Sequence, residues 1–241
     1  MRIWQRAIAA LLLVLGQGAI ADPAPLILAA DYAEPTTRYT HGILGDAVEW
    51  GALRLELADC TDCPKRRVVL RLPQHRVFED VAPRVVDLGT GRALVVVVES
   101  DLSKGARLAI YDAQGVVAAT PFIGTRNRWL APIGAADLDG DGKVELAYID
   151  RPHLAKTLRL WRFEDGKLTE VAQLPGVTNH RIGEADIAGG FRNCTGTPEM
   201  IVATADWSHL IAVTFDGQTL QKRDLGPHKG RQSFRAVLAC R

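Results

Sequence analysis

The residues with the clearest capacity for chemistry form a short acidic loop from Asp137 to Glu145. The loop reads Asp-Leu-Asp-Gly-Asp-Gly-Lys-Val-Glu, so carboxylates occupy its first, third, fifth and ninth positions. Calcium binds roughly six to eight oxygen atoms, and alternate acids on a tight loop can point toward one centre. The spacing predicts one structural calcium site formed by Asp137, Asp139, Asp141, the backbone carbonyl of Lys143, and Glu145.

Two other interpretations of this loop compete with a calcium site. An EF-hand needs flanking helices and a bidentate glutamate at its twelfth position, which is Tyr148 here. A polar turn, in which aspartates accept backbone N–H groups, is the second alternative. We prefer the polar turn for Asp46, Asp87 and Asp186, which align with Asp137 but lack the acids that follow it.

The segment from Ile133 to Leu146 resembles the FG-GAP/VCBS repeat of integrin-α-type β-propellers. The resemblance implies that the acidic loop joins the first two strands of a propeller blade. It also implies that Asp137, Asp139, Asp141 and Glu145 bind calcium, although the ninth position is usually aspartate in that family. Only residues 131–150 match strongly, so the resemblance implies one metal site.

A second set of polar and aromatic residues recurs in the connectors between predicted repeats. In a propeller such connectors emerge at the end opposite the acidic loop, where binding residues concentrate on a rigid scaffold. Arginine pairs with carboxylates and aromatic rings stack, so we expect an electropositive pocket for an anionic, sugar-like or peptide ligand. The alternative is that these residues only satisfy turn backbones. They are Arg38, Tyr39, His41, Arg126, Asn127, Arg128, Trp129, Asn179, His180, Arg181 and Arg231.

Sequence motifs of catalysis are absent. The chain contains no G-x-S-x-G elbow, no H-E-x-x-H zinc motif and no phosphate-binding glycine loop. Ser208 and His209 follow Asp206, but neighbours in a strand point to opposite faces, so they do not form a triad. His75, His153 and His228 are each isolated among turn residues. We therefore name no catalytic residue.

Two functions from different classes remain open. The first is a binding or scaffold protein of the cell envelope that recognises a protein, a glycan or a small anionic ligand. The second is a hydrolase or lyase that acts on a polysaccharide or a phosphoester at the mouth of the channel. Carboxylates or histidines about 3 Å apart at that mouth would favour the enzyme. Arginine and aromatic residues alone would favour binding.

The elements that must position these residues are predicted to be β-strands. Short apolar runs such as 93–98 and 144–149 recur, and no stretch of a dozen residues keeps a helical period. The aspartates at positions 46, 87, 137 and 186 are spaced by 41, 50 and 49 residues, which is typical of propeller blades.

We therefore predict an all-β fold, a small β-propeller of four to five four-stranded blades. A single domain would span residues 22–241. Its closure would come from pairing of an N-terminal strand at 26–32 with a C-terminal strand at 231–240. The repeat units are predicted at 37–80, 81–130, 131–180 and 181–228.

The N-terminus predicts export. Arg2 and Arg6 precede an apolar run at 7–15, and Ala19-Ile20-Ala21 follows as a cleavage site, so residues 1–21 read as a signal peptide. The run is too short to span a membrane, so we expect a periplasmic or secreted protein without a transmembrane segment after cleavage. The remaining 27 basic and 28 acidic residues give no bulk charge that would attract nucleic acid.

Four cysteines in an exported chain favour disulfides. Three pairings are open, and we favour Cys60 with Cys63 and Cys194 with Cys240. The alternative for Cys60-Thr61-Asp62-Cys63 is a redox motif. That chemistry normally requires a helix N-terminus to lower the thiol pKa, and no helical pattern follows Cys63.

Overall fold

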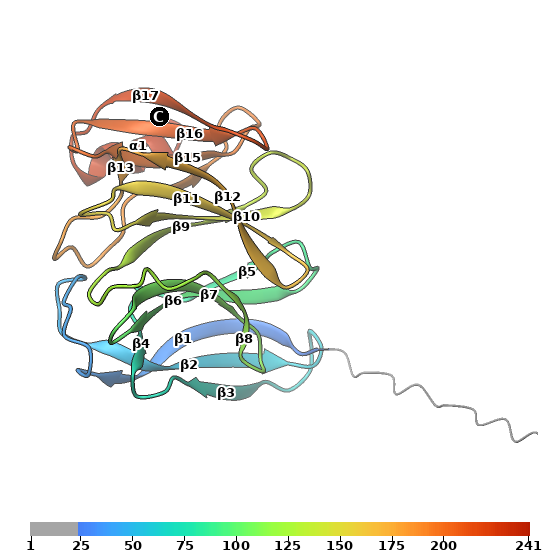
Figure 1. Ribbon diagram of the computed structural model, residues 1–241. Coiled ribbons are helices and arrows are strands. Elements are labelled where there is room, and N and C mark those ends of the chain that lie inside the picture. The colour runs from blue at the N-terminus through green and yellow to red at the C-terminus, as the bar shows by residue number, and fades with distance from the viewer. Residues whose placement is uncertain (1–23) are drawn as a thin grey trace, which may run out of the picture.

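The computed structural model describes residues 24–241 as four antiparallel strand meanders. The predicted signal peptide, residues 1–21, lies outside the described residues. The all-β prediction is confirmed, with one short helix at the C-terminus. In Figure 1 the meanders lie one above another, from β1, β2 and β3 at the bottom to β15, β16 and β17 at the top.

The strands group by sequence order. The first meander is β1 (Leu26–Thr36), β2 (Glu49–Ala58) and β3 (Arg66–Arg71). The short strand β4 (Arg76–Phe78) links it to the second meander. The second is β5 (Arg84–Asp87), β6 (Ala93–Asp101), β7 (Gly105–Tyr111) and β8 (Val116–Ala119). The third is β9 (Leu130–Ala136), β10 (Val144–Asp150), β11 (Thr157–Glu164) and β12 (Lys167–Pro175). The fourth comprises β13 (Val177–Thr178), β14 (Gly190–Arg192), β15 (Glu199–Thr204), β16 (His209–Phe215) and β17 (Leu220–Pro227).

The meanders pair into three sheets. β4 joins the first and second meanders into one eight-stranded sheet, the third forms a four-stranded sheet, and the fourth forms a five-stranded sheet. Strand β6 is almost continuously buried, because hydrophobic clusters lie on both of its faces. Its run of valines suits such a strand, since β-branched side chains pack well on a pleated surface.

The first meander differs from the predicted repeat. It begins at Leu26, before the predicted boundary at residue 37, and Asp46 lies in the long loop between β1 and β2. That loop contacts the loop between β13 and β14, where the N–H of Gly183 donates to the carbonyl of Ile43 at 3.0 Å. The first and fourth meanders therefore meet through loops.

The predicted closing strand at 231–240 is wrong. Residues Arg231–Leu238 form the helix α1, and β1 pairs only with β2 among the described strands. The physical reason is the spacing of Phe234, Val237 and Leu238, which places three apolar side chains on one helical face. Phe234 is buried and Val237 and Leu238 pack beside it against the fourth meander.

Both favoured disulfides are confirmed. Cys60 is bonded to Cys63, and Cys194 is bonded to Cys240, which ties the end of α1 to the loop after β14. Among the described residues, no helix is both long and apolar enough to cross a membrane.

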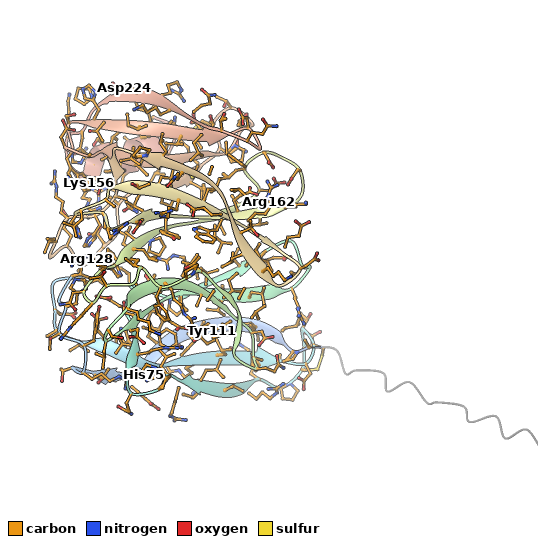
Figure 2. The ribbon with its side chains drawn as sticks, in the orientation of Figure 1. His75, Tyr111, Arg128, Lys156, Arg162 and Asp224 are labelled. Carbon is orange, nitrogen blue, oxygen red and sulfur yellow. A yellow bond between two sulfur atoms is a disulfide. The ribbon has the colours of Figure 1, made fainter. Side chains whose placement is uncertain are left out.

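The stacked meanders have two loop-bearing ends. Figure 2 shows Arg128 and Lys156 at one end and Arg162 at the other. We call the first the connector end, and it carries the loops at 37–48, 125–129, 151–156 and 179–184. The second is the acidic-loop end.

Candidate functional site

The acidic loop forms the turn between β9 and β10. Gly140 and Gly142 adopt left-handed backbone angles, with φ of 78° and 84°, which glycine tolerates best. Their N–H groups donate to the two oxygens of Asp137, at 2.8 and 3.0 Å. The first aspartate therefore shapes the turn from within.

Arg162, which no sequence motif marked as a site residue, reaches into the loop from β11. Its guanidinium contacts Asp139 at 2.8 Å, Asp141 at 3.1 Å and Glu145 at 2.6 Å. Glu145 pairs with Arg162 across the β10–β11 ladder, so only knowledge of the strand register could have identified the contact. Glu145 is buried, and burial raises the pKa of its carboxyl although hydrogen bonds from Leu138 and Arg162 oppose the shift.

The acids of the loop lie close enough to hold a metal ion. Ligand atoms of Asp137, Asp139 and Glu145 all fall within 4.8 Å of one another. Carboxylate oxygens are the donors that hard cations prefer, so the donor set fits calcium chemically. The side chain of Lys143 points to another partner, Glu164, at 2.8 Å.

The aligned aspartates of the other repeats behave as different features. Asp46 and Asp87 accept backbone N–H groups, from Val48 and from Thr90, which confirms the polar turns. Asp186 instead accepts from Arg231 at 2.9 Å.

The connector end contains a cavity of about 220 Å³ that brings several predicted ligand residues together. Four of its lining residues were expected, and they are His41, Asn127, Arg128 and Trp129. Five others were not expected, and they are Ile43, Arg151, His153, Leu154 and Ile182.

Trp129 forms a buried wall of this cavity. Its indole N–H donates to the carbonyl of Glu79 at 2.8 Å, and its ring stands edge-to-face with His180 at 4.9 Å. Asn127 and Arg151 line the cavity with positive φ angles of 53° and 44°. Such strained conformations of non-glycine residues occur often at functional sites.

His41 is oriented by a buried carboxylate. Its Nδ1 lies 2.6 Å from Oε1 of Glu79, and the hydroxyl of Ser100 donates to the other oxygen. Burial raises the pKa of Glu79, while the contact with His41 opposes that shift. Nε2 of His41 has no hydrogen-bond partner within residues 24–241, so it is available at the cavity.

A chain of hydrogen bonds defines the proton positions on two further histidines. Nε2 of His180 lies 2.8 Å from the carbonyl of Glu184, and a carbonyl only accepts, so Nε2 carries the proton. Nδ1 of His180 then accepts from Nε2 of His153 at 3.1 Å. Burial and the nearby His180 lower the pKa of His153 to about 4. His153 is therefore neutral at pH 7, with an acceptor lone pair on Nδ1.

Two further buried acids lie near Glu79, the carboxylate that orients His41. Glu49, Glu79 and Asp80 are almost fully buried. Burial, followed by the charges of Glu79, Asp46 and Asp80, raises the pKa of Glu49 to about 9. Glu49 is therefore protonated at neutral pH in the folded state.

The other expected ligand residues do not line the cavity. Arg38 donates to the carbonyl of Arg76 at 2.9 Å, Tyr39 is fully buried, and Arg126 is exposed. Asn179 is buried and donates to the carbonyl of Ala131 at 3.2 Å. The remaining three also contact protein groups, and they are His180, Arg181 and Arg231. For these residues the structure favours the alternative that they satisfy the scaffold.

Asp206, Ser208 and His209, which have the residue types of a catalytic triad, do not hydrogen-bond to one another as a triad would. Ser208 donates to Asp206 at 2.8 Å, whereas His209 contacts Asp224 at 2.7 Å.

No family model matches the chain, and no curated protein matches it. A solved structure of an exotype rhamnogalacturonan lyase, YesX, is similar at 14% identity and a TM-score of 0.41, covering 86% of this chain and 50% of that chain. The chain thus spans half the length of that lyase. A likeness this distant carries no argument about function.

Proposed function

We propose that the protein is a binding module whose connector-end cavity takes a small ligand with an anionic group and hydroxyl or amine donors. The observation that carries the proposal is the charge of Arg128. No carboxylate pairs with Arg128 among the described residues, whereas Arg151 beside it is neutralised by Asp150 at 2.8 Å. The guanidinium of Arg128 donates to the carbonyl of Asn127 at 2.9 Å, but it meets no carboxylate within residues 24–241. A guanidinium at a cavity whose charge is not neutralised is suited to a carboxylate or phosphate.

The histidines supply complementary acceptors. Neutral His153 offers its Nδ1 lone pair, and His41 offers Nε2 on a ring held by Glu79. Ligands with hydroxyl or amine hydrogens near an anionic group satisfy both kinds of contact. Sugar acids, hydroxy acids and amino acids share this chemistry.

An apolar rim surrounds these polar groups. Leu154 and Ile182 line the cavity and are 63% and 70% exposed. Exposed large apolar side chains beside a cavity are typical of binding surfaces. The rim supports a ligand that also presents a nonpolar face, such as a sugar ring.

The test is a ligand screen on the mature chain. A thermal-shift panel of sugar acids, hydroxy acids and amino acids, followed by calorimetry, should find one class that stabilises the protein. Arg128→Gln should weaken its binding by about tenfold or more, because a charge-assisted hydrogen bond contributes about 1.5–3 kcal/mol. Arg126→Gln is the matched control, since Arg126 is exposed on the same connector and does not line the cavity. Equal binding by the two variants would reject the site.

We also propose the wider setting of this module, an exported FG-GAP/VCBS-like β-propeller of the cell envelope with one calcium site. In a propeller the blades surround a central channel. In this protein, strands of three meanders line one cavity of about 250 Å³, and they include β5 through Val86, β9 through Gly134 and β14 through Phe191. This arrangement supports the proposed propeller. The disulfides suit an oxidising compartment such as the periplasm. Thermal unfolding in calcium and in chelator tests the metal, because an ion that binds only the folded state raises its stability.

A hydrolase or lyase that acts on a polysaccharide or a phosphoester is the second candidate. The pairs His41–Glu79 and His153–His180, at 2.6 and 3.1 Å, meet the spacing expected for an enzyme, and a carboxylate that orients an imidazole is a recurring general-base arrangement. We place this function second because Glu79 and His180 are fully buried, so only His41 and His153 of these pairs line the cavity. Its test is turnover of polysaccharide and phosphoester substrates by the wild type and by His41→Gln. Turnover that the variant retains would exclude His41 as the base.

A further inference from the structure

All eight carboxylate oxygens of the acidic loop have partners within the protein. Five accept backbone N–H groups of the loop, and the other three face Arg162. The five donors are Gly140 and Gly142 to Asp137, Asp141 to Asp139, Lys143 to Asp141, and Leu138 to Glu145. The three facing Arg162 belong to Asp139, Asp141 and Glu145.

Arg162 is placed as a cation would be. Each of its three nitrogens contacts a different acid, and its side chain is only 17% exposed. A planar guanidinium with several donors is well suited to bind converging carboxylates. The positive charge also offsets the mutual repulsion of acids that lie this close together.

The fourth meander also has a glutamate paired with arginine at the corresponding strand position, but it has no acidic loop there. Glu199 pairs with Arg192, the last residue of β14, just as Glu145 pairs with Ala136, the last residue of β9. The two glutamates therefore occupy equivalent positions. Glu199 contacts Arg192 at 2.7 Å and also pairs with Arg223. An arginine–glutamate pair closes this corner where no run of aspartates accompanies it.

A metal ion at the loop would need oxygens that Arg162 already holds. The three contacts use one oxygen from each of three expected ligands, and calcium draws its ligand oxygens to about 2.4 Å. A dication bound to those oxygens would lie beside the positive charge of the guanidinium, and the two like charges repel each other. We propose that Arg162 is the resident cation of the acidic loop, so that the loop is ordered without metal and a divalent cation must displace the guanidinium to bind.

This inference builds on the proposed calcium site, and its test separates the two. Calcium binding is measured by calorimetry on the decalcified mature chain for the wild type, Arg162→Gln and Arg159→Gln. Arg159 is the matched control, because it also lies on β11 and pairs with acids, Asp150 and Glu170, outside the loop. Arg162→Gln should bind calcium at least about tenfold more tightly than the wild type, and Arg159→Gln should match the wild type.

Thermal unfolding provides the second readout. Arg162→Gln should unfold at a lower temperature than the wild type in chelator, and calcium should stabilise it more than it stabilises the wild type. If only Arg162→Gln binds calcium, the inference stands and the calcium site of the wild type fails. Equal or weaker calcium binding by the variant, or no binding by either protein, overturns the inference. Should Arg162→Gln not fold, Arg162→Lys replaces it, since one ammonium cannot span the three acids, and the same tighter binding is expected.

Discussion

His41, which lines the connector-end cavity, forms a close pair with Glu79, with Nδ1 of His41 2.6 Å from Oε1 of Glu79. Glu79 is fully buried, whereas His41 reaches the cavity, so the pair links the core to the proposed ligand. The loop that carries His41 belongs to the first meander, and the other walls belong to later ones. The cavity therefore depends on contacts between distant parts of the chain.

The first prediction concerns the coupling of this pair. We expect His41→Ala and Glu79→Gln each to lower the free energy of unfolding, because each leaves a buried partner unsatisfied. In the double variant the losses should be less than additive, with a coupling of about 1–3 kcal/mol. Urea unfolding of the four proteins at pH 7 measures it. Additive losses would show that the contact does not stabilise the fold.

The second prediction follows from Glu49, whose pKa burial and the neighbouring Glu79 raise to about 9. Because the folded pKa is higher than the unfolded value near 4.5, the folded state holds an extra proton between these pH values. The contribution of Glu49 to the free energy of unfolding should therefore be fully present below about pH 4.5. It should decrease as the pH rises toward 9, with a slope of up to about 1.4 kcal/mol per pH unit.

Glu49→Gln tests that slope, because glutamine keeps the shape of the protonated acid and cannot ionise. The free energy of unfolding of this variant should vary less with pH between 5 and 9 than that of the wild type. Asp31→Asn, at an exposed position of β1, serves as the control and should leave the slope unchanged. A wild-type profile that rises with pH across this range would contradict the assignment.

Much of the fold was predictable because its signals are local. Strand positions such as 93–98 follow from runs of β-branched residues, and the turns at Asp46 and Asp87 follow from short polar segments. The helix at Arg231–Leu238 was missed because a segment of eight residues satisfies a strand pattern and a helical pattern at once.

The candidate sites were less predictable because they depend on register and on packing between meanders. The contact of Arg162 with Glu145 requires knowledge of how β10 pairs with β11. His153 lines the cavity and contacts His180, which lies 27 positions later in the chain, so sequence spacing does not reveal the pair. At the connector end, sequence spacing could not separate Arg128, at the cavity, from Arg181, which packs on Trp207.

The third prediction concerns the two disulfides, which differ in the length of chain they close. Cys194 and Cys240 are 46 positions apart, and Cys60 and Cys63 are 3 apart. A disulfide lowers the entropy of the unfolded chain, and this effect grows with the length of the loop that the disulfide closes. The double variant Cys194→Ser/Cys240→Ser should therefore lose about 4 kcal/mol in the free energy of unfolding, and Cys60→Ser/Cys63→Ser about 2 kcal/mol.

Denaturant unfolding of both double variants measures the difference. The longer bridge also holds the end of α1, so its loss should increase protease cleavage after residue 230. A larger loss from the short bridge would contradict this explanation.

The fourth prediction uses two glycines that share a left-handed backbone but differ in surroundings. A Cβ added to Gly189 would lie 2.1 Å from the carbonyl oxygen of Ile201 in β15, whereas one at Gly196 would meet nothing within 4 Å. Both have φ near 90°, at 84° and 91°, so the backbone cost of alanine is similar, about 1 kcal/mol. The clash at Gly189 adds displacement of a central strand, so Gly189→Ala should destabilise by roughly 2 kcal/mol more than Gly196→Ala. Thermal and denaturant unfolding of the two variants decide the matter, and equal losses would mean that β14 and β15 do not approach each other this closely.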